Sequence, residues 1–171
     1  QIHLGKCAQG YWRRGNQAIR LYGFVSPVTR FTFCWNEKWE LVWTYPDADE
    51  RHPGLADVRI ADFGGNGEPQ VVVGFWGPVG IHGVSSAGRR QWGCRELTSI
   101  VSLAVSMPDD VGSRQVLATS DQGPILPINR YGNTYPKIRV GRWPIHVLYA
   151  AEFPSPKVTP YCGLSYAADG R

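Results

Sequence analysis

Residues 57–63 read Asp57-Val58-Arg59-Ile60-Ala61-Asp62-Phe63, and residues 70–75 read Gln70-Val71-Val72-Val73-Gly74-Phe75. Blocks of the same kind return about 45 residues further on, at 100–106 and 115–118, and another begins at Ile145. A four-stranded antiparallel sheet takes roughly 40–50 residues, so this period predicts the blades of a β-propeller and disfavours a helical solenoid.

Each repeat is expected to hold four antiparallel strands joined by polar turns. The chain divides into approximate units of 1–48, 55–97, 98–142 and 143–171, the last of them incomplete. The block 70–75 is almost continuously apolar, which is typical of a strand packed on both faces. The expected strands of the first unit are 2–12 (a poor match), 18–24, 30–35 and 40–45, and those of the second are 58–63, 70–75, 80–84 and one that begins at 90–92. In the third unit they are 100–106, 115–118, 125–128 and 135–140, and in the fourth 145–153 and 160–165. Pro124, Pro127 and Pro136 remove hydrogen-bond donors, so the outer part of the third unit is expected to be irregular.

The predicted fold is therefore all-β, a single propeller segment of about three and a half four-stranded blades. Closed propellers have about 4–8 blades, and a sheet that stops in mid-blade leaves an exposed edge. We expect the chain to be a fragment of a larger propeller. Alternatively, it forms a homodimer in which two copies complete each other's split blade.

The composition excludes several classes of protein. With 43% hydrophobic and 12% aromatic residues among 171, the chain is expected to fold rather than to be disordered. The net charge of +4 is spread over scattered basic residues, which does not indicate a nucleic-acid-binding surface. No apolar run reaches the roughly 18–20 residues of a membrane span.

The spacing of the cysteines and histidines indicates neither a metal site nor a catalytic site. The four cysteines, Cys7, Cys34, Cys94 and Cys162, form no Cys-x-x-Cys pair, so a structural zinc site is not expected. They are either buried thiols or members of two disulfides of unknown connectivity. No histidine has a partner at catalytic or metal-binding spacing, so no catalytic residue is assigned.

The loop between the first two strands of the second unit carries a resemblance to a known family. It reads Asp62-Phe63-Gly64-Gly65-Asn66-Gly67-Glu68-Pro69 before the apolar strand, and residues 83–92 continue as Gly-Val-Ser-Ser-Ala-Gly-Arg-Arg-Gln-Trp. Both segments resemble the FG-GAP/VCBS-type repeats of bacterial propeller proteins and integrin α-subunits. The resemblance is specific in this loop and looser over residues 16–168.

In that family the loop can hold calcium through alternating acidic side chains, which implies Asp62 and Asn66 as metal ligands here. The third position of the motif is Gly64 and the ninth is Gln70, so two family ligands are replaced. Calcium prefers several carboxylate oxygens on a tight glycine turn. The other interpretation is an Asx turn made by Asp62 and Asn66 without metal. No other cofactor is expected.

The seven tryptophans divide into two groups. Trp43 and Trp92 fall at equivalent places in the fourth strands of their units, which favours packing between blades. Trp39 and Trp76 lie near turns, where an exposed ring could stack on a sugar or a protein partner. They are the candidate ligand-stacking residues.

These observations favour a non-catalytic binding or scaffolding module that contacts a protein or a carbohydrate. The family resemblance implies an extracellular or cell-envelope location. The alternative is part of a propeller enzyme, either a quinoprotein-like oxidoreductase or a polysaccharide-acting enzyme. A carbohydrate-binding lectin is a third hypothesis.

Overall fold

The computed structural model describes residues 6–14, 17–25, 30–46, 51–140, 145–150 and 161–164. Within these ranges the chain is all-β, with 13 strands in antiparallel sheets and one short 3-10 helix, η1 (Gly77–Val79). Predicted features at 151–160 and beyond 164, and parts of the first unit, lie outside the described residues.

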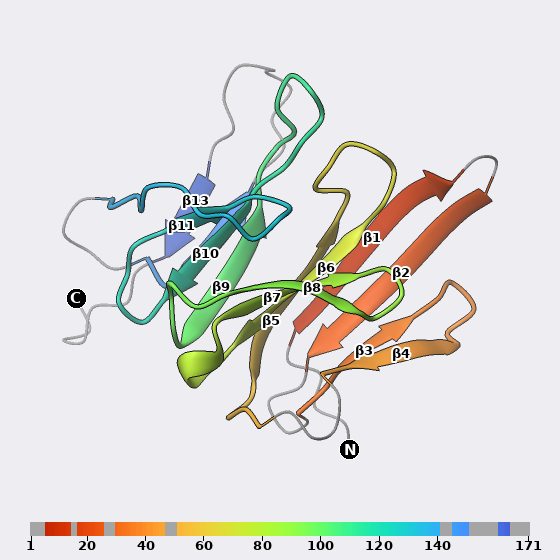
Figure 1. Cartoon of the computed structure of the whole chain (residues 1–171), viewed down its shortest axis with the longest axis horizontal. Helices are drawn as coiled ribbons and strands as arrows, with labels where there is room; N and C mark the ends of the chain where they lie inside the picture. The colour runs from red at the N-terminus through yellow and green to blue at the C-terminus, as the bar shows by residue number, and fades with distance from the viewer. Residues whose placement is uncertain are drawn as a thin grey trace.

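The strands form sheets in which chain neighbours pair. The first sheet holds β1 (Lys6–Arg14), β2 (Gln17–Val25), β3 (Thr32–Trp35) and β4 (Leu41–Tyr45); the second holds β5 (Leu55–Ala61), β6 (Gln70–Phe75), β7 (Ile81–Ser85) and β8 (Arg90–Cys94); the third holds β9 (Ile100–Val105), β10 (Val116–Ser120) and β11 (Leu126–Ile128); and β12 (Val147–Ala150) pairs with β13 (Tyr161–Leu164). The first three sheets follow one another across the molecule in chain order (Figure 1).

The predicted strand at 135–140 is not continuous, and this outer part of the third unit is irregular, as its prolines predict. The structure has only isolated bridges there, from Ile125 to Ile138 and from Ile128 to Thr134. Pro127 and Pro136 lack the N–H groups that a continuous ladder would need. Conversely, the first strand of the first unit, a poor match in sequence, is the nine-residue strand β1.

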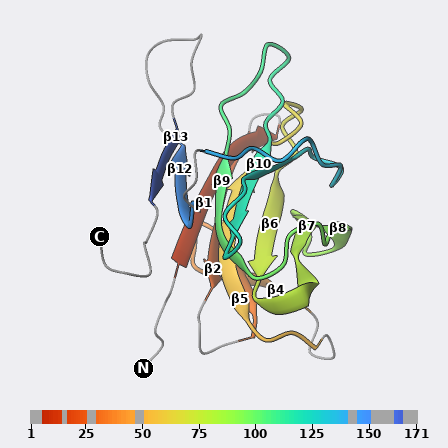
Figure 2. The same cartoon turned by 90° about the vertical axis from the view of Figure 1, so that its left-hand side faces the viewer.

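The first strands of successive sheets lie side by side, β1 against β5, β5 against β9 and β9 against β12. Strands β7 and β8 extend to the side of the molecule opposite β12 and β13 (Figure 2). The first strands therefore form one side of the contact between neighbouring sheets.

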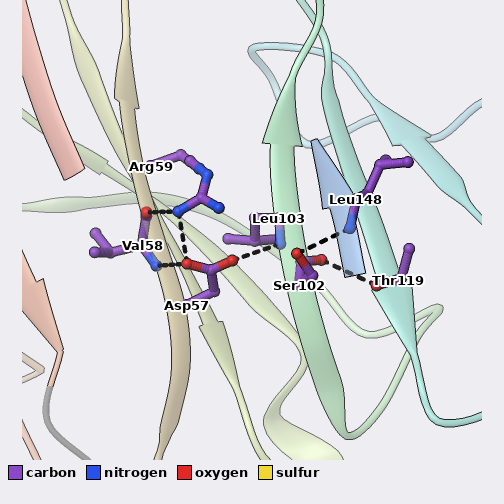
Figure 3. Close-up of polar contacts among 7 residues, drawn as sticks. All are labelled: Asp57, Val58, Arg59, Ser102, Leu103, Thr119 and Leu148. Atoms are coloured by element: carbon purple, nitrogen blue, oxygen red, sulfur yellow. Dashed lines mark hydrogen bonds and ion pairs between the residues drawn. The ribbon is translucent and has the colours of Figure 1, made fainter. Parts of the chain in front are cut away.

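A side-chain contact joins these first strands, and it recurs along the chain. The carboxylate of Asp57 on β5 accepts a hydrogen bond from the backbone N–H of Leu103 on β9, at 2.8 Å. Forty-five residues on, the hydroxyl of Ser102 accepts from the backbone N–H of Leu148 on β12, at 3.4 Å (Figure 3). Asp57 has no exposed surface and forms an ion pair of 2.7 Å with Arg59.

The hydrophobic core consists of clusters between neighbouring sheets. Val71 and Val73 of β6 belong to the cluster shared with the first sheet, whereas Val72 belongs to the cluster shared with the third. A smaller cluster around Leu117 and Leu148 joins the third sheet to β12. The apolar run of β6 is therefore packed on both faces, as the sequence predicts.

The turns after the third strands of the first three sheets share one geometry. The side chain of Asn36 accepts from the N–H groups two and four residues ahead, and Ser85 and Asn129 do the same in the next two sheets. The fourth residue of each turn has positive φ: Trp39 at 61°, Gly88 at 79° and Gly132 at 84°. Glycine accepts this conformation without the steric cost that tryptophan bears.

Trp43 and Trp92 pack from one sheet to the next, as predicted. A Cβ placed on Gly88 would lie 2.8 Å from the Trp43 ring, and one on Gly132 would lie 2.9 Å from the Trp92 ring. The indole N–H of Trp43 also donates to the carbonyl of Ser86, at 2.9 Å. Each ring thus covers the turn of the following sheet.

Candidate ligand-binding site

The loop between β5 and β6 is organised by Asp62. Its Oδ1 accepts from the backbone N–H groups of Gly64 and Asn66, at 3.1 and 3.2 Å, and its Oδ2 accepts from that of Gly67, at 2.7 Å. Asn66 Oδ1 accepts from the N–H of Glu68 at 3.1 Å. The Asx-turn interpretation therefore describes the hydrogen bonds of this loop.

The same loop does not fit a calcium site. Asp62 and Asn66 give one carboxylate and one amide, against the roughly 6–8 oxygen ligands that Ca²⁺ takes. At Gly64, where the family motif has a ligand, a Cβ would collide with the guanidinium of Arg130. The described residues contain no group of three or more His, Cys, Asp or Glu that could hold a metal ion. A cationic side chain thus covers the position of the missing ligand.

The two candidate stacking residues do not form one platform. Trp39 is 58% exposed in the turn between β3 and β4, and Trp76 is 42% exposed beside η1, between β6 and β7. In an antiparallel meander these connections lie at opposite ends of the sheets. A single small ligand would not contact both rings.

Two clefts occupy equivalent places in neighbouring sheets. Each lies between the loop that joins the first two strands and the turn after the third strand. The second-sheet cleft has a volume of about 270 Å³, and its walls include Asn66, Gln70, Ser86 and Gln91. The amide of Gln70 donates to that of Gln91 at 2.6 Å, which joins two of its walls.

The third-sheet cleft is larger, about 480 Å³. Its walls come from residues 106–109 and 113–115 and from the turn region, and its distinctive side chains are Arg114, Arg130, Tyr131 and Tyr135. This volume falls in the range of roughly 300–1,000 Å³ usual for small-molecule sites.

Arg130 stands where the two clefts meet, because it lines both of them. Its guanidinium lies against Gly64 and 4.9 Å from the centre of the Tyr131 ring. The backbone N–H of Arg114 donates to the carbonyl of Phe63 at 3.0 Å, which ties the loop after β9 to the loop after β5. The cleft walls are therefore held together across two sheets.

The buried titratable groups lie away from these clefts. Tyr45 Oη and His82 Nδ1 are 2.7 Å apart in the core between the first two sheets. Burial, and to a lesser degree Arg90, Arg95 and His52, lowers the pKa of His82 to about 4. Among the described cysteines, Cys34 and Cys94 are free, and burial raises the pKa of the Cys34 thiol to about 12. These thiols are structural rather than reactive.

Sequence reasoning missed the third-sheet cleft. Its signal was present: Arg130 and Tyr135 lie 44 residues after Ser86 and Gln91, so polar positions of one repeat become cationic and aromatic in the next. Of the predicted residues, Asp62 organises the loop between β5 and β6, and Trp39 lies exposed in a turn, where the sequence places it.

Comparisons with known proteins leave the family open. No family model matches the sequence, and no curated protein matches it. A solved structure that is similar is that of a protein of unknown function from Bacteroides caccae, with 12% sequence identity and a TM-score of 0.46. The match covers 87% of this chain and 50% of that one, so this chain spans about half the length of that protein.

Helices contribute little to the described part of the chain. None of those present there has the length and apolar character needed to cross a membrane.

Proposed function

We propose that the chain is a segment of a β-propeller, akin to FG-GAP/VCBS-type repeats, that serves as a non-catalytic binding module for a carbohydrate or protein. Support for the propeller comes from the recurring edge contacts of Asp57 and Ser102 and from the recurring rings of Trp43 and Trp92. Both repeat at the blade-sized spacing of the sequence. An extracellular or envelope location belongs to the same proposal and rests on the family resemblance.

One observation carries the binding function: the same place in two successive sheets forms a cleft, and only the third-sheet cleft combines two arginines with two tyrosines. Loops on a rigid repeated scaffold are free to vary and commonly hold ligands. Cationic and aromatic substitutions at equivalent positions are what a binding surface needs, whereas packing between sheets does not require them.

A glycan array with the purified chain tests this function. Saturable binding that is lost in Tyr135→Ala, but kept in Gln91→Ala at the equivalent place of the second sheet, would support it. Binding that neither substitution changes would place any site elsewhere. Quinone-dependent turnover of a substrate would favour the oxidoreductase hypothesis instead.

A further inference from the structure

The third-sheet cleft carries two positive charges against one negative charge. Arg114 and Arg130 line it, and Asp109 lies in the same wall. Nη1 of Arg114 donates to the carbonyl of Ser106 at 3.1 Å, which fixes the guanidinium and leaves its other N–H groups as donors. A planar guanidinium binds a carboxylate through two parallel hydrogen bonds, so this cleft favours a ligand with an isolated carboxylate.

The tyrosines give the cleft aromatic surface. Tyr131 is 66% exposed and Tyr135 is 45% exposed, although large aromatic side chains are usually mostly buried. Tyrosine combines an apolar ring with a hydroxyl, which suits a ligand that has both C–H faces and hydroxyl groups. Sugars have both.

Polar side chains complete the lining. Gln115 and Ser113 add neutral hydrogen-bonding groups to the same cleft. Oδ1 of Asp109 accepts from the N–H groups of Val111 and Ser113, so this carboxylate organises the loop as well as lining the cleft. Its negative charge disfavours densely charged anions such as polyphosphates.

We propose that the third-sheet cleft binds an acidic saccharide, with the uronic carboxylate held by Arg114 and Arg130 and a sugar ring packed on Tyr131 and Tyr135. This inference deepens the proposed binding function and rests on it. The second-sheet cleft, with Ser86 and Gln91 at the equivalent positions, shares Arg130 at its border, but neither Arg114 nor a tyrosine lines it. It therefore serves as an internal control.

Isothermal titration of the whole chain with a galacturonic acid trisaccharide, and with the corresponding neutral galactose trisaccharide, tests this assignment. We expect saturable binding of the acidic sugar, at least about tenfold weaker binding of the neutral sugar, and affinity that falls as salt rises. Arg130→Ala and Arg114→Ala should each weaken acidic binding by about tenfold or more.

Matched variants separate site effects from folding. Gln91→Ala in the second-sheet cleft and Arg51→Ala, at the opposite end of the second sheet, should leave binding unchanged. Arg130→Lys keeps the charge but not the planar fork, and should weaken binding less than Arg130→Ala. Thermal melting of each variant should match that of the parent chain.

The outcomes distinguish the acidic ligand from the more general glycan-binding function. Equal binding of the neutral sugar with dependence on Tyr135 would overturn the acidic ligand but keep a glycan-binding module. Acidic binding that is insensitive to both Arg114 and Arg130 would overturn this site. If the chain binds no glycan on an array and neither trisaccharide, the carbohydrate-binding function falls together with this inference.

Discussion

His82 is almost fully buried, and its neutral ring is part of the core between the first two sheets. Its Nδ1 lies 2.7 Å from the Tyr45 hydroxyl, and its ring lies tilted against Phe75. Protonation would put a charge into this apolar surrounding, which is why the pKa falls.

We predict that His82 makes the stability of the chain depend on pH. Its folded-state pKa of about 4 is below the unfolded value of 6.5, so the unfolded chain binds the proton more readily. The stabilisation is complete above about pH 6.5 and is lost progressively as the pH falls toward 4, by at most ~3 kcal/mol. Urea unfolding between pH 7 and pH 4 would measure it.

His82→Gln is the comparison for that experiment. Other groups titrate in the same range, so the contribution of His82 is the difference between the two chains. A parent and variant with equal pH slopes would contradict the prediction.

Gly64 and Arg130 decide how the loop of Asp62 responds to calcium. Because a guanidinium covers the place of the missing ligand, millimolar calcium should leave the melting temperature of the parent chain unchanged. The double variant Gly64→Asp with Arg130→Ala restores a carboxylate and removes the cation, and calcium should raise its melting temperature. A calcium-induced rise in the parent chain would show that Asp62 and Asn66 bind the metal after all.

At the scale of elements, the turns before β8 and after β11 are fixed by backbone conformation and by a neighbouring ring. Gly88→Ala and Gly132→Ala each add a Cβ at positive φ, within 3 Å of a tryptophan. We expect each to lower the free energy of unfolding by about 1–3 kcal/mol, measured by urea denaturation. Ala87→Gly, one residue earlier in an exposed position, is the control and should change it by less than ~1 kcal/mol. A Gly88→Ala chain as stable as the control would mean that the Trp43 ring moves aside freely.

Sequence patterns predict the elements whose burial or backbone conformation leaves a mark on residue type. The run of β6 is apolar because both of its faces are buried, and the glycines at 88 and 132 mark positive φ. The segment 135–140 forms bridges instead of a strand because its partner β11 contains Pro127, so the prolines predicted this part better than the repeat did. Strand β1 was a poor match in sequence although it is regular. Neither outcome is visible in the spacing of apolar residues alone.

The candidate site was less predictable than the fold. Trp39 and Trp76 are exposed as expected, but the distinctive side chains at 114, 130, 131 and 135 come together only when two loops and a turn fold against one another. Period-two patterning indicates which strand face is buried and gives no information on contacts between loops.

For the whole molecule, we expect the contact of Asp57 with β9 to couple the stability of neighbouring sheets. Asp57→Asn removes the ion pair with Arg59 and places an amide N–H among backbone donors. We expect a loss of about 2–4 kcal/mol, because the change leaves buried groups of this network unpaired. Ser102→Ala, which removes the longer equivalent bond, should cost only about 1 kcal/mol.

The same variants test whether the sheets unfold together. Neighbouring repeats that are tightly coupled unfold in one transition, and weakening their interface separates them. Tryptophan fluorescence and far-ultraviolet circular dichroism should therefore give one coincident transition in the parent chain and a broader, non-coincident one in Asp57→Asn. Coincident transitions in Asp57→Asn would mean that the apolar clusters alone couple the sheets.

Trp39 makes the turn of the first sheet different from those of the next two. In the second and third sheets a glycine at this turn position leaves room for the tryptophan ring of the sheet before it, whereas the first sheet has Trp39 at the same position. If a copy of the second sheet were fused ahead of β1, the ring equivalent to Trp92 would meet residue 39. We expect that ring to pack there only after Trp39 is changed to glycine. The identity of residue 39 thus decides whether another sheet can pack against the first one.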